Sequence, residues 1–193
     1  MSKKELSLYE IRDKAIDSRR AVFSAQQLAN FIGKSKLIAS VYLNRMVKKG
    51  LAVQLAKGKI SFDEDEFVIA SQLLEPCYIS FTMALYLNQK MMQVPAVIEC
   101  ATPKRSITYK KLGIIYRKIP KGLFYGFKKE RKSKSYIMLA DPEKALIDSI
   151  ILNKISKSFV DELIPEMNKE KIAEYTAKYS GRGKKKLKKW LKC

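Results

Sequence analysis

Several residues of one short segment carry side chains that can contact the edges of DNA bases. Asn44 and Arg45 can each form two hydrogen bonds with a single base, and Ser40 lies at the edge of the same helical face. Leu37 and Val41 share that face, and their methyl groups suit the methyl group of thymine. The types and spacing of these residues predict that the segment reads the major groove of duplex DNA.

Positive side chains accompany this segment. Lys34 and Lys36 lie at its start, and Lys48 lies near its end on the predicted outward face. Lysines beside a base-reading helix usually contact phosphates, which fix the register of the protein on the duplex. We therefore expect these three lysines to bind the DNA backbone.

Two short helices separated by a glycine would position these side chains. Ser24 and Gln27 predict a capping box at the start of the first helix, and Gly33 predicts its end. Ser35 predicts the N-cap of a second helix that ends before Gly50. Apolar residues recur at helical spacing on the inward faces: Ala25, Leu28, Ala29 and Ile32 in the first helix, and Ala39, Leu43, Met46 and Val47 in the second.

A hairpin with a basic tip is predicted after Gly50. Residues 51–55 alternate as in a strand, residues 56–59 form a turn, and the chain returns through residues 60–62. Lys57 and Lys59 at the tip suit contact with phosphates or the minor groove. This order of elements predicts a winged helix-turn-helix domain over residues 1–66. The alternative is a small helical subdomain with solvated lysines, used for protein contact.

The chain is strongly basic. Its 193 residues include 39 Lys and Arg against 19 Asp and Glu, for a net charge of +20 and a pI near 9.8. DNA-binding domains commonly have a pI above about 9. The segments 1–62, 63–98, 99–140, 141–170 and 171–193 have net charges of +9, −4, +10, −3 and +8. The later basic segments are expected to extend the DNA contact, with a lysine-rich solvated surface as the alternative for residues 104–134.

Residues typical of catalytic centres and metal sites are scarce. The chain has no histidine, which excludes Ser-His and Cys-His nucleophiles, and it has no glycine-rich phosphate loop. Cys77, Cys100 and Cys193 are too widely spaced for a disulfide framework or an ordinary zinc site. The acidic residues 63–66 are better explained as helix-start residues than as metal ligands. Asp141 and Glu143 beside Lys144 are better explained as the start of a helix than as the acids and lysine of a nuclease. We therefore expect no enzymatic activity, no metal and no cofactor.

No segment predicts membrane insertion. The longest apolar run, residues 78–87, contains Ser80 and Thr82 and is shorter than the roughly 18 residues that a spanning helix needs. Acidic residues interrupt the N-terminal segment, which therefore does not resemble a signal peptide. A cytoplasmic protein without membrane contact is expected.

The rest of the chain predicts an opening helix and a second domain of mixed α and β structure over residues 67–193. The opening helix covers residues 5–18, and further helices are expected over 67–74, over 80–88 and from Pro142 onwards. Strands are predicted over 97–101, 107–109, 114–117, 123–127 and 136–139. The basic run 181–192 has three interpretations: a membrane-surface helix, a DNA-backbone contact, or a closing helix that docks its apolar side on the core.

Several motifs in this second domain occur in the order found in one family. They are Tyr78-Ile79-Ser80 with Ala84-Leu85, the Val94-Pro95 step, Thr102-Pro103-Lys104-Arg105, Phe124-Tyr125-Gly126-Phe127, and the helix 143–148. Together they resemble the C-terminal domain of the AbiEi-type antitoxins, which are also described as transcriptional regulators of viral defence systems. The chain departs from the family at Asn88-Gln89-Lys90, where His or Gly is typical.

The resemblance implies an α+β antitoxin domain joined to a winged helix-turn-helix. It implies a transcriptional autorepressor that binds inverted repeats in its own promoter and opposes a nucleotidyltransferase-like toxin in a type IV toxin–antitoxin operon. By analogy, the DNA-binding cations would be Lys34, Lys36, Arg45, Lys48, Lys57 and Lys59. Two alternatives stay open: an antitoxin that masks its toxin by direct binding, and a standalone regulator of defence genes. The oligomeric state is not predicted.

Overall fold

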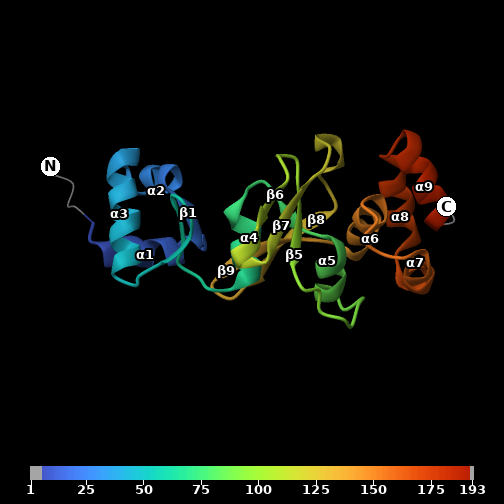
Figure 1. The fold of residues 1–193 in the computed structure, drawn as a ribbon, viewed down its shortest axis with the longest axis horizontal. Coiled ribbons are helices and arrows are strands. Elements are labelled where there is room, and N and C mark those ends of the chain that lie inside the picture. The colour runs from blue at the N-terminus through green and yellow to red at the C-terminus, as the bar shows by residue number, and fades with distance from the viewer. Residues whose placement is uncertain (1–5, 192–193) are drawn as a thin grey trace. The chain divides into compact units, whose positions relative to one another are not determined.

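The computed structural model describes residues 6–191. The predicted domains extend to residues 1–5, 192 and 193, which lie outside the described residues. The fold is of mixed α and β type, as predicted (Figure 1). Its residues form two compact units. The first unit contains the chain up to Leu73 together with Arg131–Ile137, and the second contains Leu74–Glu130 and the chain from Met138 onwards.

The first unit is built from helices around a small antiparallel sheet. The sheet has the strand order β1-β3-β2. Along the chain the elements are α1 (Leu8–Asp17), β1 (Val22–Ser24), α2 (Ala25–Ile32), α3 (Lys36–Lys48), β2 (Val53–Ala56), β3 (Lys59–Ser61) and α4 (Glu66–Leu73).

Local capping signals explain where these helices begin and end. Ser24 and Gln27 form the predicted capping box of α2, and Ser35 accepts a hydrogen bond from the Ile38 N–H at the start of α3. Gly33 ends α2 with φ 65°, a left-handed conformation that glycine adopts without steric cost. Asp65 accepts hydrogen bonds from two N–H groups in the first turn of α4, as the capping interpretation of residues 63–66 predicted.

Apolar side chains of α1, α2, α3 and the three-stranded sheet form one core. The inward residues of α2 and α3 pack against Ile11 and Ala15 of α1 and against Ile60 of β3. The ring of Phe23 contacts the rings of Phe31 and Phe62 at centroid distances of 5.3 and 5.7 Å. Strand β1, which carries Phe23, was not predicted, because three residues are too few to show an alternating pattern.

Gln72 of α4 joins β1 to the hairpin segment 131–137 of the same unit. Its side-chain oxygen accepts hydrogen bonds from the N–H groups of Ala21 and Val22 at 2.9 and 3.2 Å. Its side-chain nitrogen donates to the Ser135 hydroxyl and the Tyr136 carbonyl oxygen at 2.8 and 3.1 Å. A buried side-chain amide is thus fully used to hold three segments together.

The second unit contains most of a six-stranded sheet with the order β6-β7-β5-β4-β9-β8. Its central strand β4 pairs antiparallel with β5 and parallel with β9, and β5 pairs parallel with β7. The strands are β4 (Tyr78–Ile79), β5 (Ile98–Thr102), β6 (Ile107–Tyr109), β7 (Ile114–Lys118), β8 (Phe127–Lys132) and β9 (Ser135–Ala140). Helix α5 (Phe81–Leu87) follows β4, and short 3-10 turns η1 (Lys110–Leu112) and η2 (Lys121–Leu123) flank β7.

The predicted strand over residues 123–127 is wrong. Residues 121–123 form η2, and Gly126 has φ 72°, which breaks an extended path before β8 begins at Phe127. A Cβ atom at Gly126 would lie 2.9 Å from the Cβ atom of Lys144, so this close approach requires glycine. The bend lets Phe124 and Phe127 pack on the ring of Tyr78, at centroid distances of 5.2 and 4.5 Å.

Four helices complete the second unit and gather beside one another in Figure 1. They are α6 (Pro142–Ile151), α7 (Lys157–Leu163), α8 (Lys169–Ala177) and α9 (Gly181–Leu191), with the turn η3 (Ile164–Glu166) after α7. Leu187 and Leu191 of α9 are buried, which agrees with the docking interpretation of the basic run. Lys186 donates hydrogen bonds to the Ile150 carbonyl oxygen at the end of α6 and to Asn153, and burial lowers its pKa.

Candidate nucleic-acid interface

Helix α3 divides cleanly into a buried and an exposed face. Ala39, Leu43 and Met46 point into the core of the first unit. On the other side Asn44 and Arg45 are exposed, and Leu37 is 78% exposed. An apolar side chain that is this open to solvent, on the same helical face as polar groups that can read bases, is suited to contact with a partner surface.

Ser40 differs from its neighbours on this face. It is half-buried, and its hydroxyl donates a hydrogen bond to the Lys36 carbonyl oxygen at 2.9 Å, one turn earlier in α3. The donor capacity of this hydroxyl is thus already used by the helix backbone. The structure therefore places Ser40 at the edge of the face, where its oxygen can only accept a further hydrogen bond without rearrangement.

The cations around α3 are not neutralised locally. Lys34, Lys36 and Lys48 are exposed, as is Arg45. Within residues 6–191 none of these four side chains forms an ion pair. From Ser18 to Phe62 the chain contains no acidic residue at all. The exposed face of α3 is thus a cationic surface that carries no carboxylate of its own, and such a surface favours contact with phosphates.

The hairpin β2–β3 presents one of its two predicted lysines. Gly58 has φ 70° in the tight turn, and the exposed Lys57 stands beside it. Lys59 is half-buried instead, and its ammonium group donates a hydrogen bond to the Leu73 carbonyl oxygen. Lys59 therefore differs from the expected position at a free tip, because a backbone acceptor at the end of α4 holds its side chain.

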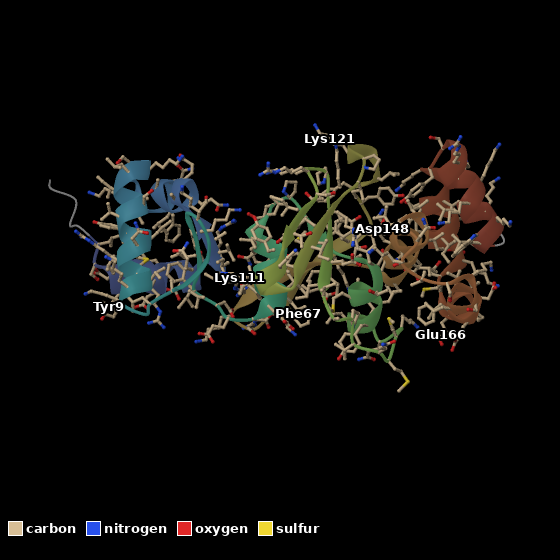
Figure 2. The ribbon with its side chains drawn as sticks, in the orientation of Figure 1. Tyr9, Phe67, Lys111, Lys121, Asp148 and Glu166 are labelled. Carbon is tan, nitrogen blue, oxygen red and sulfur yellow. The ribbon has the colours of Figure 1, made fainter. Side chains whose placement is uncertain are left out.

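The second unit contains a buried charged cluster that the sequence interpretation missed. Lys144 and Asp148 of α6 form an ion pair at 2.7 Å, and the Lys144 side chain is 0% exposed. Asp148 also accepts hydrogen bonds from the hydroxyls of Tyr78 and Ser80, at 3.0 and 2.8 Å. The ammonium group lies 4.5 Å from the centre of the Tyr125 ring. Asp148, labelled in Figure 2, lies where α6 meets the sheet.

The signal for this cluster was present but ambiguous. Lys144 and Asp148 are four residues apart, and an opposite-charge pair at this spacing usually lies on a solvated helix face. Their immediate neighbours, Ala145, Leu146 and Ile147, are apolar around the helix, which is the pattern of a fully buried helix. The expectation that Asp141 caps this helix is confirmed by its hydrogen bond from the Lys144 N–H.

The tyrosines around this cluster should make the fold less stable at alkaline pH. Burial, together with the nearby Asp148 carboxylate, raises the pKa of Tyr78 and of Tyr179 well above the ordinary value. The pKa of these tyrosines is higher in the folded chain than in the unfolded chain, where it is about 10. The folded state is therefore favoured while the phenols are neutral, and this contribution is complete below about pH 10 and is lost as the pH rises above it. We expect the free energy of unfolding to fall from about pH 10 upwards.

Denaturant unfolding at a series of pH values, together with tyrosinate absorbance of the folded and unfolded protein, checks this expectation. The substitution Tyr179→Phe removes one of the two phenols and should make the fall with pH shallower. A folded protein in which every tyrosine ionises at its ordinary pKa would contradict the expectation.

In residues 6–191 no group of three or more His, Cys, Asp or Glu side chains is placed to hold a metal ion. Cys77 and Cys100 are buried and form no disulfide, and Cys193 lies outside the described range. Over the same described range, no helix has the length and apolar character needed to cross a membrane. The sequence matches no protein-family model and no curated protein.

Proposed function

We propose that the first unit is a winged helix-turn-helix that binds duplex DNA. The observation that carries the proposal is the exposed face of α3, which combines base-reading side chains, unpaired cations and an absence of carboxylates. The order α1, β1, α2, α3, β2 and β3, with the strand order β1-β3-β2, supports α2 and α3 as the helix-turn-helix and β2–β3 as the wing.

Each part of this face has a role in the proposal. Asn44 and Arg45 contact base edges, where each bidentate contact contributes discrimination of about 1–3 kcal/mol. Leu37 and Val41 contact thymine methyl groups. Lys34, Lys36 and Lys48 bind phosphates flanking the groove, and Lys57 binds the backbone or the minor groove beside the wing. Ser40 and Lys59 contribute less, since both already donate to backbone carbonyl oxygens.

We further propose that the protein is a transcriptional autorepressor and the antitoxin of a type IV toxin–antitoxin operon. This part rests on the resemblance of residues 78–148 to the AbiEi-type antitoxins. The toxin would be nucleotidyltransferase-like and encoded next to this chain. In this proposal the protein is not an enzyme, and repression follows from occupancy of inverted repeats in its own promoter.

A gel-shift titration with the promoter fragment tests DNA recognition. Asn44→Ala or Arg45→Ala should lower the ratio of operator to random-duplex affinity by about 1–3 kcal/mol each, because each removes a base contact. Arg182→Ala on α9 is the matched control, since it removes an exposed arginine from the second unit. Equal affinity of the unmodified protein for operator and random duplex would contradict sequence-specific binding.

A protein-binding antitoxin is the second candidate, and exposed apolar side chains of the second unit favour it. Met92 is 99% exposed and Val94 is 62% exposed in the segment between α5 and β5. These two side chains are apolar surface that a protein partner could cover. Co-purification with the product of the neighbouring gene in high salt distinguishes the candidates, because stable co-elution supports direct masking of the toxin.

A further inference from the structure

A cavity in the first unit combines groups that a small anionic ligand would need. Its volume is about 360 Å³, which lies within the range of about 300–1,000 Å³ typical of small-molecule sites. Four segments line it: Arg12 and Ile16 of α1, residues 19–21 after that helix, residues 62–64 before α4, and residues 133–135 at the β8–β9 turn. None of these residues belongs to the exposed face of α3.

Three cations in this cavity have no partner among the described residues. The side chains of Arg12, Arg19 and Lys134 form no hydrogen bond or ion pair with any residue in the range 6–191. Arg20 is positioned more firmly, because its Nε donates to the Val22 carbonyl oxygen at 3.0 Å and its guanidinium lies 5.7 Å from the centre of the Phe23 ring. Guanidinium groups bind phosphate oxygens through paired hydrogen bonds.

The other residues that line the cavity include apolar and acidic side chains. Ile16, Ala21 and the ring of Phe62 provide the apolar part. Asp63 and Glu64 provide the acidic part, and neither forms an ion pair with the arginines among the described residues. A ligand that suits the cationic, the apolar and the acidic side chains together has a phosphate group, a flat apolar ring and hydroxyl or amino donors.

Hydrogen bonds hold the cavity in shape. The Ser135 hydroxyl donates to the Arg19 carbonyl oxygen at 2.7 Å and accepts from the Gln72 side chain at 2.8 Å. Arg19 and Ser133 both have a positive backbone φ, at 59° and 52°, which residues other than glycine rarely adopt. Conformations of this kind are retained where the surroundings fix them, and they are frequent at ligand sites.

We infer that this cavity is a binding site for a nucleoside monophosphate. The phosphate is bound by Arg12 and Arg19 with Lys134, the base lies against Phe62, and the sugar hydroxyls donate to Asp63 or Glu64. A phosphate of the DNA backbone shares part of this chemistry, but it makes no use of the apolar wall. The free nucleotide therefore fits the cavity better than a duplex does.

Calorimetric titration of the whole protein with AMP and GMP tests the inference, with inorganic phosphate and adenosine as part-ligands. We expect saturable binding of a nucleotide with a Kd in the micromolar to millimolar range, and each part-ligand should bind at least about tenfold more weakly. The double substitution Arg12→Gln/Arg19→Gln should weaken nucleotide binding by about tenfold or more. Lys14→Gln, which changes an exposed cation of α1 outside this cavity, should leave it unchanged.

Three outcomes would overturn the inference. They are the absence of saturable nucleotide binding, phosphate binding as tight as nucleotide binding, and unchanged affinity in the doubly substituted protein. A fourth arm uses a short DNA duplex: if the double substitution weakens only duplex binding and no nucleotide binds, the cations serve the DNA backbone and the nucleotide site is refuted. The nucleotide arm contains no DNA, and Asn44→Ala should not alter it, so its failure is separate from a failure of the proposed DNA binding.

Discussion

Replacing Lys144 with methionine is expected to lower the free energy of unfolding by about 3–5 kcal/mol. The substitution keeps the length of the side chain but leaves the Asp148 carboxylate buried without its ammonium partner. Three hydroxyl donors, from Tyr78, Ser80 and Tyr179, remain on Asp148, and they do not neutralise its charge. Equilibrium unfolding in urea, followed by circular dichroism, measures the loss.

The matched control is Lys157→Met. Lys157 and Asp161 form an ion pair at the same four-residue spacing on α7, but both side chains are partly solvated, so the loss should stay within about 1 kcal/mol. The double substitution Lys144→Met/Asp148→Leu removes both buried charges and should recover part of the stability. Equal losses for Lys144→Met and Lys157→Met would show that the buried pair has no special importance.

Raising the salt concentration from about 50 to about 200 mM is expected to weaken operator binding by about two orders of magnitude, because four lysines of the proposed interface bind phosphates. Each lysine that binds a phosphate contributes about 0.9 to the slope of log affinity against log salt. Replacing Lys34, Lys36, Lys48 and Lys57 together by glutamine should therefore make the measured slope much shallower. Fluorescence anisotropy with a labelled operator provides the measurement.

A second quadruple variant serves as the comparison. Replacing Lys184, Lys185, Lys188 and Lys189 of α9 by glutamine removes the same charge from the second unit. If the cations around α3 and the wing contact the phosphates, this variant should retain most of the slope. Equal reductions in both variants would mean that overall charge, and not the proposed surface, determines the salt dependence.

The elements around α3 could be predicted because their signals are local. Ser24, Gln27, Gly33 and Ser35 act on the backbone within four residues, so their effect does not depend on the rest of the fold. The tight turn at Gly58 is local in the same way. Sequence alone therefore located both helices, the hairpin and the inward face of α3.

The features that sequence missed depend on distant residues. Lys59 is drawn to the carbonyl oxygen of Leu73, and Lys144 is buried because aromatic residues from several elements close around it. The short strand β4 pairs with β5 and β9, and no local sequence pattern predicts this pairing. No strand was predicted over most of β8, because five of its six residues, all but Phe127, are charged. Charged residues are nevertheless common in strands at the edge of a sheet, where β8 lies.

The hydrogen bonds of Gln72 determine how this protein can be dissected. A fragment that ends at residue 66 lacks the acceptor for the Ala21 and Val22 amides, and a fragment that ends at Leu73 still lacks Ser135 and Tyr136. The unit that carries α3 is therefore discontinuous along the chain, and no single cleavage point releases it whole. An autonomous fragment that carries the proposed DNA-binding surface would need residues 131–137 joined to it through a designed linker. Deletion from the C-terminus would therefore damage this unit before it isolated the unit.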